Sequence, residues 1–537
     1  MSPPEGAPGA LLELRGLTIA RPGGAALLED IDLSLQPGDS VALLGASGAG
    51  KSTLMAALHD RAGLTARGFS ITAARLEIRA AIGVVPQRGA LFDHLSVAGN
   101  LALAMRNADE PVPTARQPEE IARWLAHLDL STRWGDPGSR GEPMSGGEAQ
   151  RVAVARTFAG GRRILLLDEP SVGLDPLRVR MLAAVLRREL RENHAAALVV
   201  THDLHFAAAF ADRFLAMDRG RRALVPLDVR AAGDDAAARS PEVTRALEAR
   251  LEAAITDHLS HEAGDSRAPT TRARGWLQEV ARAWLAPFVV IARVVERAPQ
   301  SLIARARDLP EVARVVLKQG LLRPAPFFAV VSTLVGFTIL YIFHRSLAVG
   351  GVPLRPDRVF SLIGSMHIIA LAPALAGILF VATSGSAITA WLGSMSLTRQ
   401  TTALQALGIG EARYLWVPAW LGLALSFVAL AALFTAGMVA GGLAYLELNA
   451  PELPDAFAVI TADLLDPPPE RQVFRARALA LVGVYALGIA SDAIAKGAEE
   501  KSSAEAVTVA MVRSVMACTL WIVAIELVSL ALVYAGR

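Results

Sequence analysis

A glycine-rich stretch early in the chain could bind phosphate, and it reads Gly45-Ala46-Ser47-Gly48-Ala49-Gly50-Lys51-Ser52-Thr53. It matches the pattern G-x-x-x-x-G-K-[ST], in which glycines let the backbone wrap a phosphate. We expect Lys51 to reach the terminal phosphates and the Ser52 hydroxyl to bind magnesium. The predicted phosphate-binding residues are Gly45, Ser47, Gly48, Ala49, Gly50, Lys51, Ser52 and Thr53. A chance glycine-rich turn is the alternative, and the motifs further along the chain argue against it.

A second sequence could bind an anion in the same way, and it reads Met144-Ser145-Gly146-Gly147-Glu148. A helical pattern, Ala149 to Phe158, follows it directly. The N-terminus of a helix presents free N–H groups and the positive end of the helix dipole. A serine-glycine-glycine turn at that position therefore favours a phosphate.

These motifs need strands and helices to hold them, and the apolar runs beside them supply both. Val41 to Leu44 reads as a buried strand before the phosphate loop, and Leu54 to Leu58 reads as the helix after it. Three later strands end in polar residues. They are Ile82 to Val85 before Gln87, Ile164 to Leu167 before Asp168 and Glu169, and Ala197 to Val200 before Thr201 and His202. Leu11 to Ile19 and Ile31 to Leu35 predict a small antiparallel sheet.

The whole chain has 537 residues, of which 53% are hydrophobic and 19% charged, and its net charge is +2. That length requires more than one domain, and the small net charge gives no sign of nucleic-acid binding. The single cysteine, Cys518, excludes a disulfide within one chain. Met1 to Ala10 does not read as a signal peptide, so we expect the first domain to be cytoplasmic.

The half after about Arg323 reads as a membrane domain, because its apolar runs approach the ~20 residues that cross a bilayer. The predicted spans are 325–344, 360–382, 414–444, 476–495 and 508–534. Basic residues before the first span place its start inside. That orientation puts the segment Arg399 to Arg413 inside and the acidic loop Glu447 to Glu470 outside. We expect Trp276 to Leu309 to lie in the membrane interface, with a helix packed on the first domain as the alternative.

At this point the first ~235 residues resemble the ATPase domain of an ABC transporter. The phosphate loop, the Gln87 loop, the signature at Met144 to Glu148, the carboxylate strand and the His202 switch occur in the family's order. The resemblance implies an α/β P-loop fold that binds ATP and Mg2+, followed here by an all-α membrane domain. The signature departs from the family's Leu-Ser-Gly-Gly-Gln at its first and last residues.

The same resemblance implies a role for each motif in phosphoryl transfer to water, which depends on positioning and charge stabilisation. Asp168, Ser52 and Gln87 would hold magnesium, and Gln87 would also contact the nucleotide. Glu169 would orient or deprotonate the attacking water, and His202 would contact the terminal phosphate. Ser145, Gly146, Gly147 and Glu148 would bind ATP held by a partner chain, and Asp175 lies where the family has its D-loop. Taken alone, His202 reads as a solvated loop residue and the Asp168-Glu169 pair as a helix cap or surface pair.

The second half resembles the MlaE-type permease of lipid-transporting ABC systems that work with MCE-domain proteins. The resemblance centres on Ser384 to Ala387, Leu392 to Met395 and Ala403 to Ile409. The ATPase half is similar to the MlaF-type partner, and here the two are fused. The resemblance implies a tentative substrate path at Ser384, Gly385, Ser386 and Ala387. It also implies a coupling helix at Arg399 to Gly410, for which a plain cytoplasmic loop is the alternative. Ala370, Thr383 and Trp391 replace charged residues of the family, which leaves fewer charges in the membrane.

These features predict an ATPase domain at 1–235, a linker or extension at 236–275 and a permease domain at 276–537. We expect a homodimer, because one chain carries one phosphate loop and one signature. The predicted function is ATP-driven movement of a phospholipid or related lipid at the bacterial inner membrane, together with an MCE-type partner. The alternative is a mechanical or regulatory device in which ATP moves an outside partner and nothing crosses the membrane.

Overall fold

The structure is a computed structural model. It describes residues 9–535 except 47, 88–89, 129, 136–143, 230–238, 260–286, 297–308, 350–364, 452, 454 and 502. The chain forms two compact units. The first, which we call the ATPase unit, combines Met1–Thr271 with Thr398–Ile409. The second, the membrane unit, combines Arg272–Leu397 with Gly410–Arg537.

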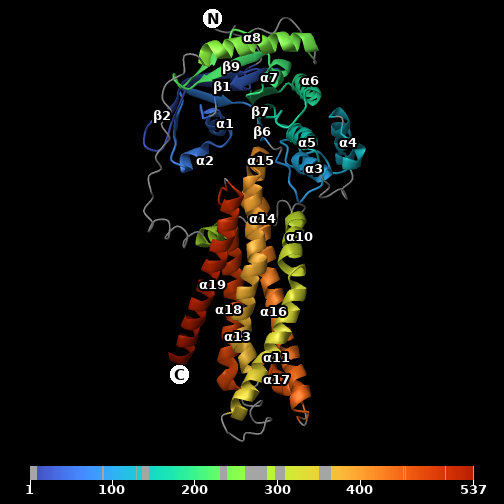
Figure 1. The fold of residues 1–537 in the computed structure, drawn as a ribbon, viewed down its shortest axis with the longest axis vertical. Helices are drawn as coiled ribbons and strands as arrows, with labels where there is room; N and C mark the ends of the chain where they lie inside the picture. Colours follow the sequence, from blue (N-terminus) through green and yellow to red (C-terminus); the bar gives the residue numbers. More distant parts are fainter. Residues whose placement is uncertain are drawn as a thin grey trace. The chain divides into compact units, whose positions relative to one another are not determined.

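The ATPase unit is built on a six-stranded sheet with the order β10-β9-β3-β8-β7-β6 (Figure 1). Its strands are β3 (Ser40–Leu44), β6 (Ile82–Val85), β7 (Ile164–Asp168), β8 (Ala196–Val200), β9 (Arg213–Asp218) and β10 (Ala223–Pro226). All pair in parallel except β10. Every residue of β3 and β8 is buried. Both faces of these two strands are therefore covered, as is usual for a parallel sheet with helices on each side.

A second sheet is antiparallel and consists of four strands. They are β1 (Leu12–Ala20), β2 (Ala26–Leu35), β4 (Ser70–Thr72) and β5 (Arg75–Ile78). Strand β1 pairs with each of the other three. The predicted small antiparallel sheet is confirmed, although β2 starts five residues earlier than the Ile31 boundary expected from the sequence.

The helices of the ATPase unit come from both halves of the sequence. They are α1 (Lys51–His59), α2 (Arg61–Ala66), α3 (Val97–Arg106), α4 (Gln117–His127), α5 (Gly146–Ala159), α6 (Pro176–Glu192), α7 (Leu204–Phe210), α8 (Pro241–Leu259) and α15 (Gln400–Ala406), with a short 3-10 turn, η1, at Thr132–Gly135. Helix α8 lies in the predicted 236–275 extension, and its Leu247 and Leu251 belong to the core of this unit. The short helix α15 also belongs here, although two long apolar helices flank it in the sequence.

The membrane unit is helical, and among the described residues five helices are long and apolar enough to cross a membrane. They span Pro310–Ser346, Met366–Leu397, Ala412–Asn449, Pro469–Gly497 and Ala504–Val533. Their parts are α10 (Leu309–Leu317), η2 (Lys318–Leu322), α11 (Ala325–Val349), α13 (Met366–Phe380), η3 (Val381–Gly385), α14 (Ser386–Leu397), η4 (Ala412–Trp416), α16 (Val417–Asn449), η5 (Pro469–Arg471), α18 (Gln472–Gly497) and α19 (Ala504–Ala535). A shorter apolar helix, α17 (Ala456–Leu465), was not predicted.

The first span begins at Pro310 instead of 325, and the second span also reaches further than the sequence predicted. The prediction ended it at 382, whereas the structure continues the helix to Leu397. The helix passes through the polar residues near Thr383 and Ser384 by means of η3, a π-helical turn. The hydroxyls there bond to helix backbone, as Thr383 donates to Leu379 O at 2.8 Å. Such bonds let a polar stretch remain helical inside an apolar bundle, so it did not mark an end.

Small residues allow α11 and α16 to approach closely. A Cβ added at Gly441 would overlap the backbone of Thr333, and one at Gly437 would overlap the Ser332 side chain. Close backbone approach through small residues is typical of helices packed in membranes. The same reading holds for Gly393, where an added Cβ would lie 3.2 Å from Val507.

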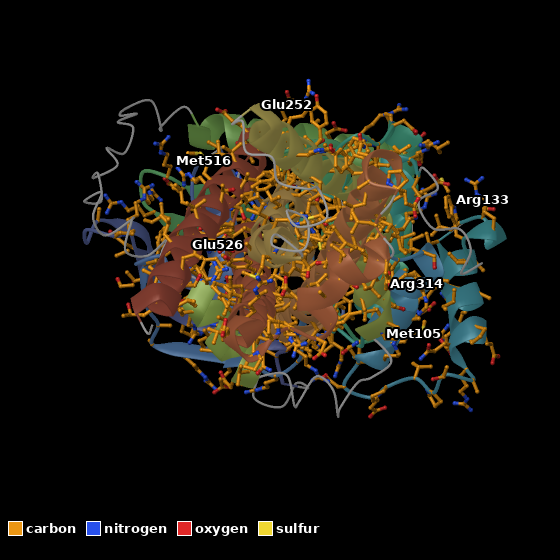
Figure 2. All side chains as sticks on the ribbon, turned by 90° about the horizontal axis from the view of Figure 1, so that it is seen from below. Met105, Arg133, Glu252, Arg314, Met516 and Glu526 are labelled. Carbon is orange, nitrogen blue, oxygen red and sulfur yellow. The ribbon has the colours of Figure 1, made fainter. Side chains whose placement is uncertain are left out.

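Among the described residues of the membrane unit, buried charged side chains are paired, although the sequence suggested that charges had been removed from it. Arg477 on α18 pairs with Glu526 on α19, whose position is labelled in Figure 2. Tyr485 also donates to Glu526, at 3.0 Å. Nearer the other end of α18, Asp492 pairs with Lys496 and accepts a hydrogen bond from Ser514 of α19 at 2.7 Å. Buried charges persist in such surroundings only when they are paired and hydrogen-bonded.

The predicted interfacial helix at Trp276 to Leu309 is described only in part. Residues 287–296 are helical, residues 276–286 and 297–308 lie outside the described residues, and Leu309 begins α10. Val290 and Val294 are buried, whereas Phe288 and Val295 are exposed. The guanidinium of Arg293 lies 5.5 Å from the centre of the Trp416 ring.

Candidate ATP-binding and hydrolysis site

Four of the predicted motifs meet at one edge of the parallel sheet. Carboxyl ends of parallel strands lie at the same edge, which is where ligands bind in open α/β sheets. The phosphate loop follows β3, Gln87 follows β6, Asp168 ends β7 and His202 follows β8. Strand β3 is central and pairs with both β8 and β9. The sheet order therefore brings the motifs together although they are up to 157 residues apart in the chain, from Gly45 to His202.

The phosphate loop depends on glycine at defined positions. Gly45, Gly48 and Gly50 have φ angles of 144°, 80° and 108°, a region that residues with a Cβ rarely adopt. At Gly50 an added Cβ would also lie 2.8 Å from Leu28. Ser47, one of the predicted ATP-binding residues, lies outside the described residues. Ala49 is buried and packs in the core, while Ser52 and Thr53 lie in the first turn of α1.

The Lys51 side chain lies against the phosphate loop, where it is predicted to bind phosphate. Its Nζ donates to Gly45 O at 2.7 Å and to Ala46 O at 2.9 Å. Burial lowers the pKa of Lys51, while the negative charges of Glu169 and Asp168 act in the opposite direction. A phosphate bound in the loop would replace the two carbonyl contacts with a charge-assisted hydrogen bond.

Ser52, Asp168 and Gln87 offer the oxygen ligands that magnesium prefers. Burial raises the pKa of Asp168, and the neighbouring charge of Glu169 raises it further. The negative charge of ionised Asp168 is therefore incompletely compensated, and a bound cation would compensate it. This donor set fits Mg2+, with Gln87 exposed at the end of β6.

Glu169 is held by the backbone and by the segment after β8. Its φ angle is 48°, a strained value for a residue with a side chain. Its Oε1 lies 2.8 Å from His202 Nδ1, and its Oε2 accepts hydrogen bonds from the Thr201 hydroxyl at 3.1 Å and from the His202 backbone N–H at 3.3 Å. The Glu169 side chain is 15% exposed and that of His202 is 72% exposed. The two predicted catalytic residues are thus in direct contact.

Thr201 was not predicted as part of the site, and it is fully buried. Its hydroxyl both donates to Glu169 and accepts a hydrogen bond from Asp203 N at 3.0 Å. It therefore fixes the carboxylate and the turn that carries His202. A threonine at the carboxyl end of a strand beside a predicted catalytic histidine was the available signal.

The signature residues Ser145, Gly146, Gly147 and Glu148 form the start of α5. Ser145 caps the helix, and its hydroxyl accepts a hydrogen bond from Glu148 N at 3.3 Å. Glu148 Oε2 in turn accepts from Ser145 N at 2.9 Å, which completes a capping box. The hydrogen bond from the Ser145 backbone holds the pKa of Glu148 below its ordinary value. The departure from the family pattern at Glu148 therefore has a local structural use.

Asp175 caps the next helix, α6. Its Oδ1 accepts hydrogen bonds from Leu177 N at 3.1 Å and Arg178 N at 3.0 Å. The bond from the Arg178 backbone lowers the pKa of Asp175. Leu174 beside it reaches Gly147, where an added Cβ would lie 2.6 Å from its side chain. The D-loop and the signature are therefore packed against each other within one chain.

A buried arginine that the sequence did not single out connects the signature helix to the segment after Gln87. Arg156 of α5 donates to Ala90 O at 2.7 Å, and its guanidinium lies 4.7 Å from the centre of the Phe92 ring. Burial lowers the pKa of Arg156 to about 9. Asn100 of α3 holds the same segment by accepting a hydrogen bond from Phe92 N at 2.9 Å.

Helix α15 packs on that segment, where a coupling helix was predicted. Gln400 is buried, and its Nε2 donates to Asp93 Oδ2 at 2.8 Å. Leu407 lies against Gly160 at the end of α5, where an added Cβ would be 3.1 Å from its side chain. Arg399 precedes the helix with a φ angle of 60°, and its charge acts to lower the pKa of Asp168. The segment therefore folds as a packed helix, which argues against the plain cytoplasmic loop that was the alternative at Arg399 to Gly410.

The residues predicted to line a substrate path are mostly engaged within the membrane unit. Ser384 is fully buried and donates to Gly320 O at 2.8 Å. Gly385 is buried, and Ser386 donates to Ala382 O at 2.7 Å. Ala387 is half-buried. The hydroxyls of Ser384 and Ser386 thus satisfy helix backbone within a single chain.

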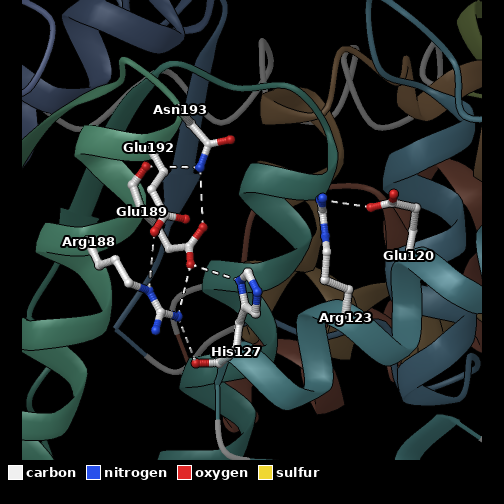
Figure 3. Close-up of polar contacts among 7 residues, drawn as sticks. All are labelled: Glu120, Arg123, His127, Arg188, Glu189, Glu192 and Asn193. Atoms are coloured by element: carbon white, nitrogen blue, oxygen red, sulfur yellow. Dashed lines mark hydrogen bonds and ion pairs between the residues drawn. The ribbon is translucent and has the colours of Figure 1, made fainter.

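A histidine–glutamate cluster away from the ATP site joins α4 to α6 (Figure 3). His127 Nδ1 lies 3.1 Å from Glu189 Oε1, and Arg188 donates to the same oxygen at 3.2 Å. Asn193 donates to Glu189 Oε2 at 3.2 Å. Glu192 completes a group with ligand atoms close enough to surround a metal ion. Both oxygens of Glu189 already accept hydrogen bonds. We therefore interpret the cluster as a set of contacts that holds α4 to α6 and not as a metal site.

Comparison with known families finds two separate matches along the chain. Residues 28–172 match the ABC transporter family, and residues 317–532 match the family described as Permease MlaE. The first match lies within the ATPase unit, and the second covers most of the membrane unit together with residues 398–409, which belong to the ATPase unit. The fusion of the two families in one polypeptide, predicted from the motifs, is confirmed.

Relatives of the ATPase half are numerous, and three illustrate their range. The Fe(3+) ions import ATP-binding protein FbpC of Pseudomonas fluorescens is 36% identical, over 38% of this chain and 59% of that protein. The arginine transport ATP-binding protein ArtM of Bacillus subtilis is 35% identical, over 36% of this chain and 82% of that protein. The macrolide export ATP-binding/permease protein MacB of Rhodopseudomonas palustris is 35% identical, over 44% of this chain and 38% of that protein.

The first of these proteins is matched over little more than half its length, and the three names give three different substrates. The common property is the ATP-binding domain, which ArtM shares over most of its sequence. The chain therefore belongs to the ABC transporter family, and it joins an ABC ATPase to a MlaE permease in one polypeptide.

Proposed function

We propose that this protein is an ATP-driven transporter that moves a phospholipid or a related lipid. The observation that carries the proposal is which segments of the chain make up the ATPase unit. Its sheet gathers the nucleotide motifs at one edge, and the same unit holds α15, which the sequence places between two permease helices. ATP chemistry and the permease are thus connected through Gln400 and Asp93.

In the proposed reaction the residues act by positioning and by charge. Lys51 and the N–H groups at the start of α1 bind the phosphates, and Ser52, Asp168 and Gln87 hold Mg2+. The metal neutralises charge on the phosphates when it is bound. Glu169 orients the attacking water and accepts its proton, while His202 contacts the terminal phosphate. The contact between Glu169 and His202 keeps both groups at the same point.

The active form is proposed to be a homodimer. Each chain carries one phosphate loop and one signature. In the ABC family each ATP is enclosed by the loop of one ATPase and the signature of the other, so two copies related by two-fold symmetry complete two sites. Exposed Ser145 and Gly146 at the start of α5 are available to a partner's nucleotide.

The lipid substrate, the MCE-type partner and the bacterial inner membrane are proposed from the permease half. It matches the MlaE family over 317–532, and its helices are strongly apolar. Lipid would bind between the two permeases of the dimer, where Ser386 and Ala387 remain partly accessible. The mechanical alternative calls for a large outer domain, whereas the described part of the predicted outer loop holds one short helix, α17, between the end of α16 and the start of η5.

Reconstitution in liposomes tests the proposal. Purified protein would be assayed for ATP hydrolysis at several contents of anionic phospholipid and for transfer of a fluorescent phospholipid to a supplied MCE-domain protein. We expect lipid to change the hydrolysis rate, because lipid can drive the cycle only through different affinities for its states. The Lys51→Ala variant is the control for both signals. Vigorous hydrolysis that ignores lipid and yields no transfer would favour the mechanical device.

A further inference from the structure

The switch histidine His202 lies directly before α7, a helix of only seven residues. A helix this short is not stable alone, so its position depends on its neighbours. Its start is fixed by Asp203, whose Oδ1 accepts a hydrogen bond from Phe206 N at 3.0 Å. The position of His202 therefore depends on what holds α7, in addition to its contacts with Glu169 and the Thr201 turn.

Two buried arginines hold the C-terminal end of α7. Arg239, which comes just before α8, donates to Ala208 O at 2.5 Å and to Ala211 O at 2.8 Å. Arg187 of α6 donates to Phe210 O at 2.9 Å. Cations at this end of a helix are favoured by its dipole and satisfy carbonyls that lack helical partners.

Both arginines also pair with Asp212, each at 2.7 Å. Asp212 accepts a hydrogen bond from the Ser40 hydroxyl at 2.6 Å, at the start of β3. Burial opposes ionisation of Asp212, yet hydrogen bonds from Ser40 and Arg187 and the charges of both arginines hold its pKa below its ordinary value. The end of α7 is thus tied to the strand that leads into the phosphate loop.

Helix α8 covers the rest of α7, and Figure 1 shows it lying across this side of the ATPase unit. Glu248 Oε2 lies 3.0 Å from Nδ1 of His205, in the first turn of α7. Leu247 and Leu251 are buried on the same face of α8, and Thr244 is fully buried beside them. The charged residues Arg245 and Glu252 are exposed.

We propose that the segment from Arg239 to the end of α8 positions the switch histidine, with Arg239 and Glu248 as positioning residues. The inference rests on the proposed ATPase activity and adds a regulation to it. Because the chain runs on from α8 to the membrane unit, this segment is a covalent connection from the permease to His202. The contact of α15 with Asp93 is a separate, non-covalent connection.

Glu248→Ala tests the proposal in the full-length protein, with Glu252→Ala on the same helix as the matched control. We expect Glu248→Ala to lower kcat about tenfold, which corresponds to about 1.4 kcal/mol in the barrier. The KM for ATP should stay within about twofold, since the phosphate loop is unchanged. Glu248→Gln keeps an oxygen that can accept from His205 and should restore most of the rate.

A purely structural role for α8 predicts a different result. It would lower the amount of folded protein, measured as ATP bound per chain, and leave the rate per bound ATP unchanged. Normal kcat in Glu248→Ala with full ATP binding would overturn the proposal. If the wild-type protein itself fails to hydrolyse ATP, the proposed function fails instead, so the two failures are distinguishable.

A protease site inserted between Ser260 and Arg272 tests the covalent connection. Cutting there leaves α8 on the ATPase and α15 in its chain position. We expect the cut protein to keep its basal hydrolysis and to lose about half of its response to lipid vesicles, by the differential-affinity argument. An unchanged lipid response after complete cleavage would show that α8 holds His202 without transmitting anything from the permease.

Discussion

The two units of the chain place their polar groups by different means. In the ATPase unit they stand at strand ends and helix starts, where the backbone fixes them, as the left-handed φ angle of Glu169 and the helix cap at Ser145 illustrate. In the membrane unit they lie within helices and are held by one another, as in the pair of Arg477 with Glu526.

The difference has a physical cause. A strand end faces water or a ligand, so an unpaired carboxylate such as Asp168 is tolerated until a cation arrives. Within an apolar bundle no water compensates an unpaired charge, so every charge there requires a partner. Substitutions should therefore impair catalysis in the first unit and stability in the second.

The largest effect is expected for Glu169→Gln. The amide keeps the size and one acceptor oxygen but cannot take up a proton from water, so hydrolysis should fall at least ~100-fold while ATP binding persists. Phosphate release in single-turnover assays and ATP binding by calorimetry would measure the two quantities. Glu192→Gln on the same unit is the control, and near-normal turnover in Glu169→Gln would refute its assignment as base.

The Arg477→Ala substitution should lower the free energy of unfolding of the membrane unit. Loss of the arginine leaves Glu526 and its Tyr485 contact without the opposing charge, at a cost of about 2 kcal/mol, because the unfolded chain in a membrane also finds polar partners. Thermal unfolding in detergent would report it. The double variant Arg477→Met with Glu526→Leu should recover most of the loss. If the single and double variants unfolded at the same temperature, the effects of Arg477 and Glu526 on stability would not depend on each other.

The contact between α15 and Asp93 should affect neither catalysis nor stability alone, but the response of hydrolysis to lipid. Gln400→Ala removes a buried hydrogen bond to Asp93, worth about 1 kcal/mol, or about fivefold in an equilibrium. We expect lipid-stimulated hydrolysis to fall by that factor while basal hydrolysis stays within twofold. Gln405→Ala, on the exposed face of the same helix, is the matched control. An equal loss of basal and stimulated rates would show that Gln400 serves the fold of the ATPase rather than its response to lipid.

The smallest effect is expected for Asp168→Asn without nucleotide. The raised pKa of Asp168 means that its contribution to stability is full below the unfolded pKa near 4 and is lost as pH rises through the folded pKa. At pH 7 the asparagine variant should therefore melt at a higher temperature than the wild type. The difference should shrink toward pH 4, and Mg2+ with ATP should stabilise the wild type more than the variant. A lower melting temperature at pH 7 would contradict the assigned cause.

Local sequence was sufficient to predict much of this protein. The order of motifs predicted the ATPase, and the structure places Gln87, Asp168 and His202 after strands that pair in one sheet. The pattern of residues 241–259 predicts a helix with one solvated face, and α8 spans Pro241–Leu259. Such features depend on turn chemistry and on periodicities of two and 3.6 residues, which a short stretch already contains.

Other features were decided only by the tertiary structure. Thr201 beside Glu169, Arg156 beneath Ala90, and Arg239 at the end of α7 join residues far apart in the chain. The pairing of Arg477 with Glu526 belongs to the same class, as does the continuation of the second span through Ser384 to Leu397. A buried polar group requires a hydrogen-bond partner. The residues next to it in the sequence show that a partner is required, but they do not show which residue it is. Which distant residue meets that need is fixed when the elements pack, because packing alone sets the distance between them.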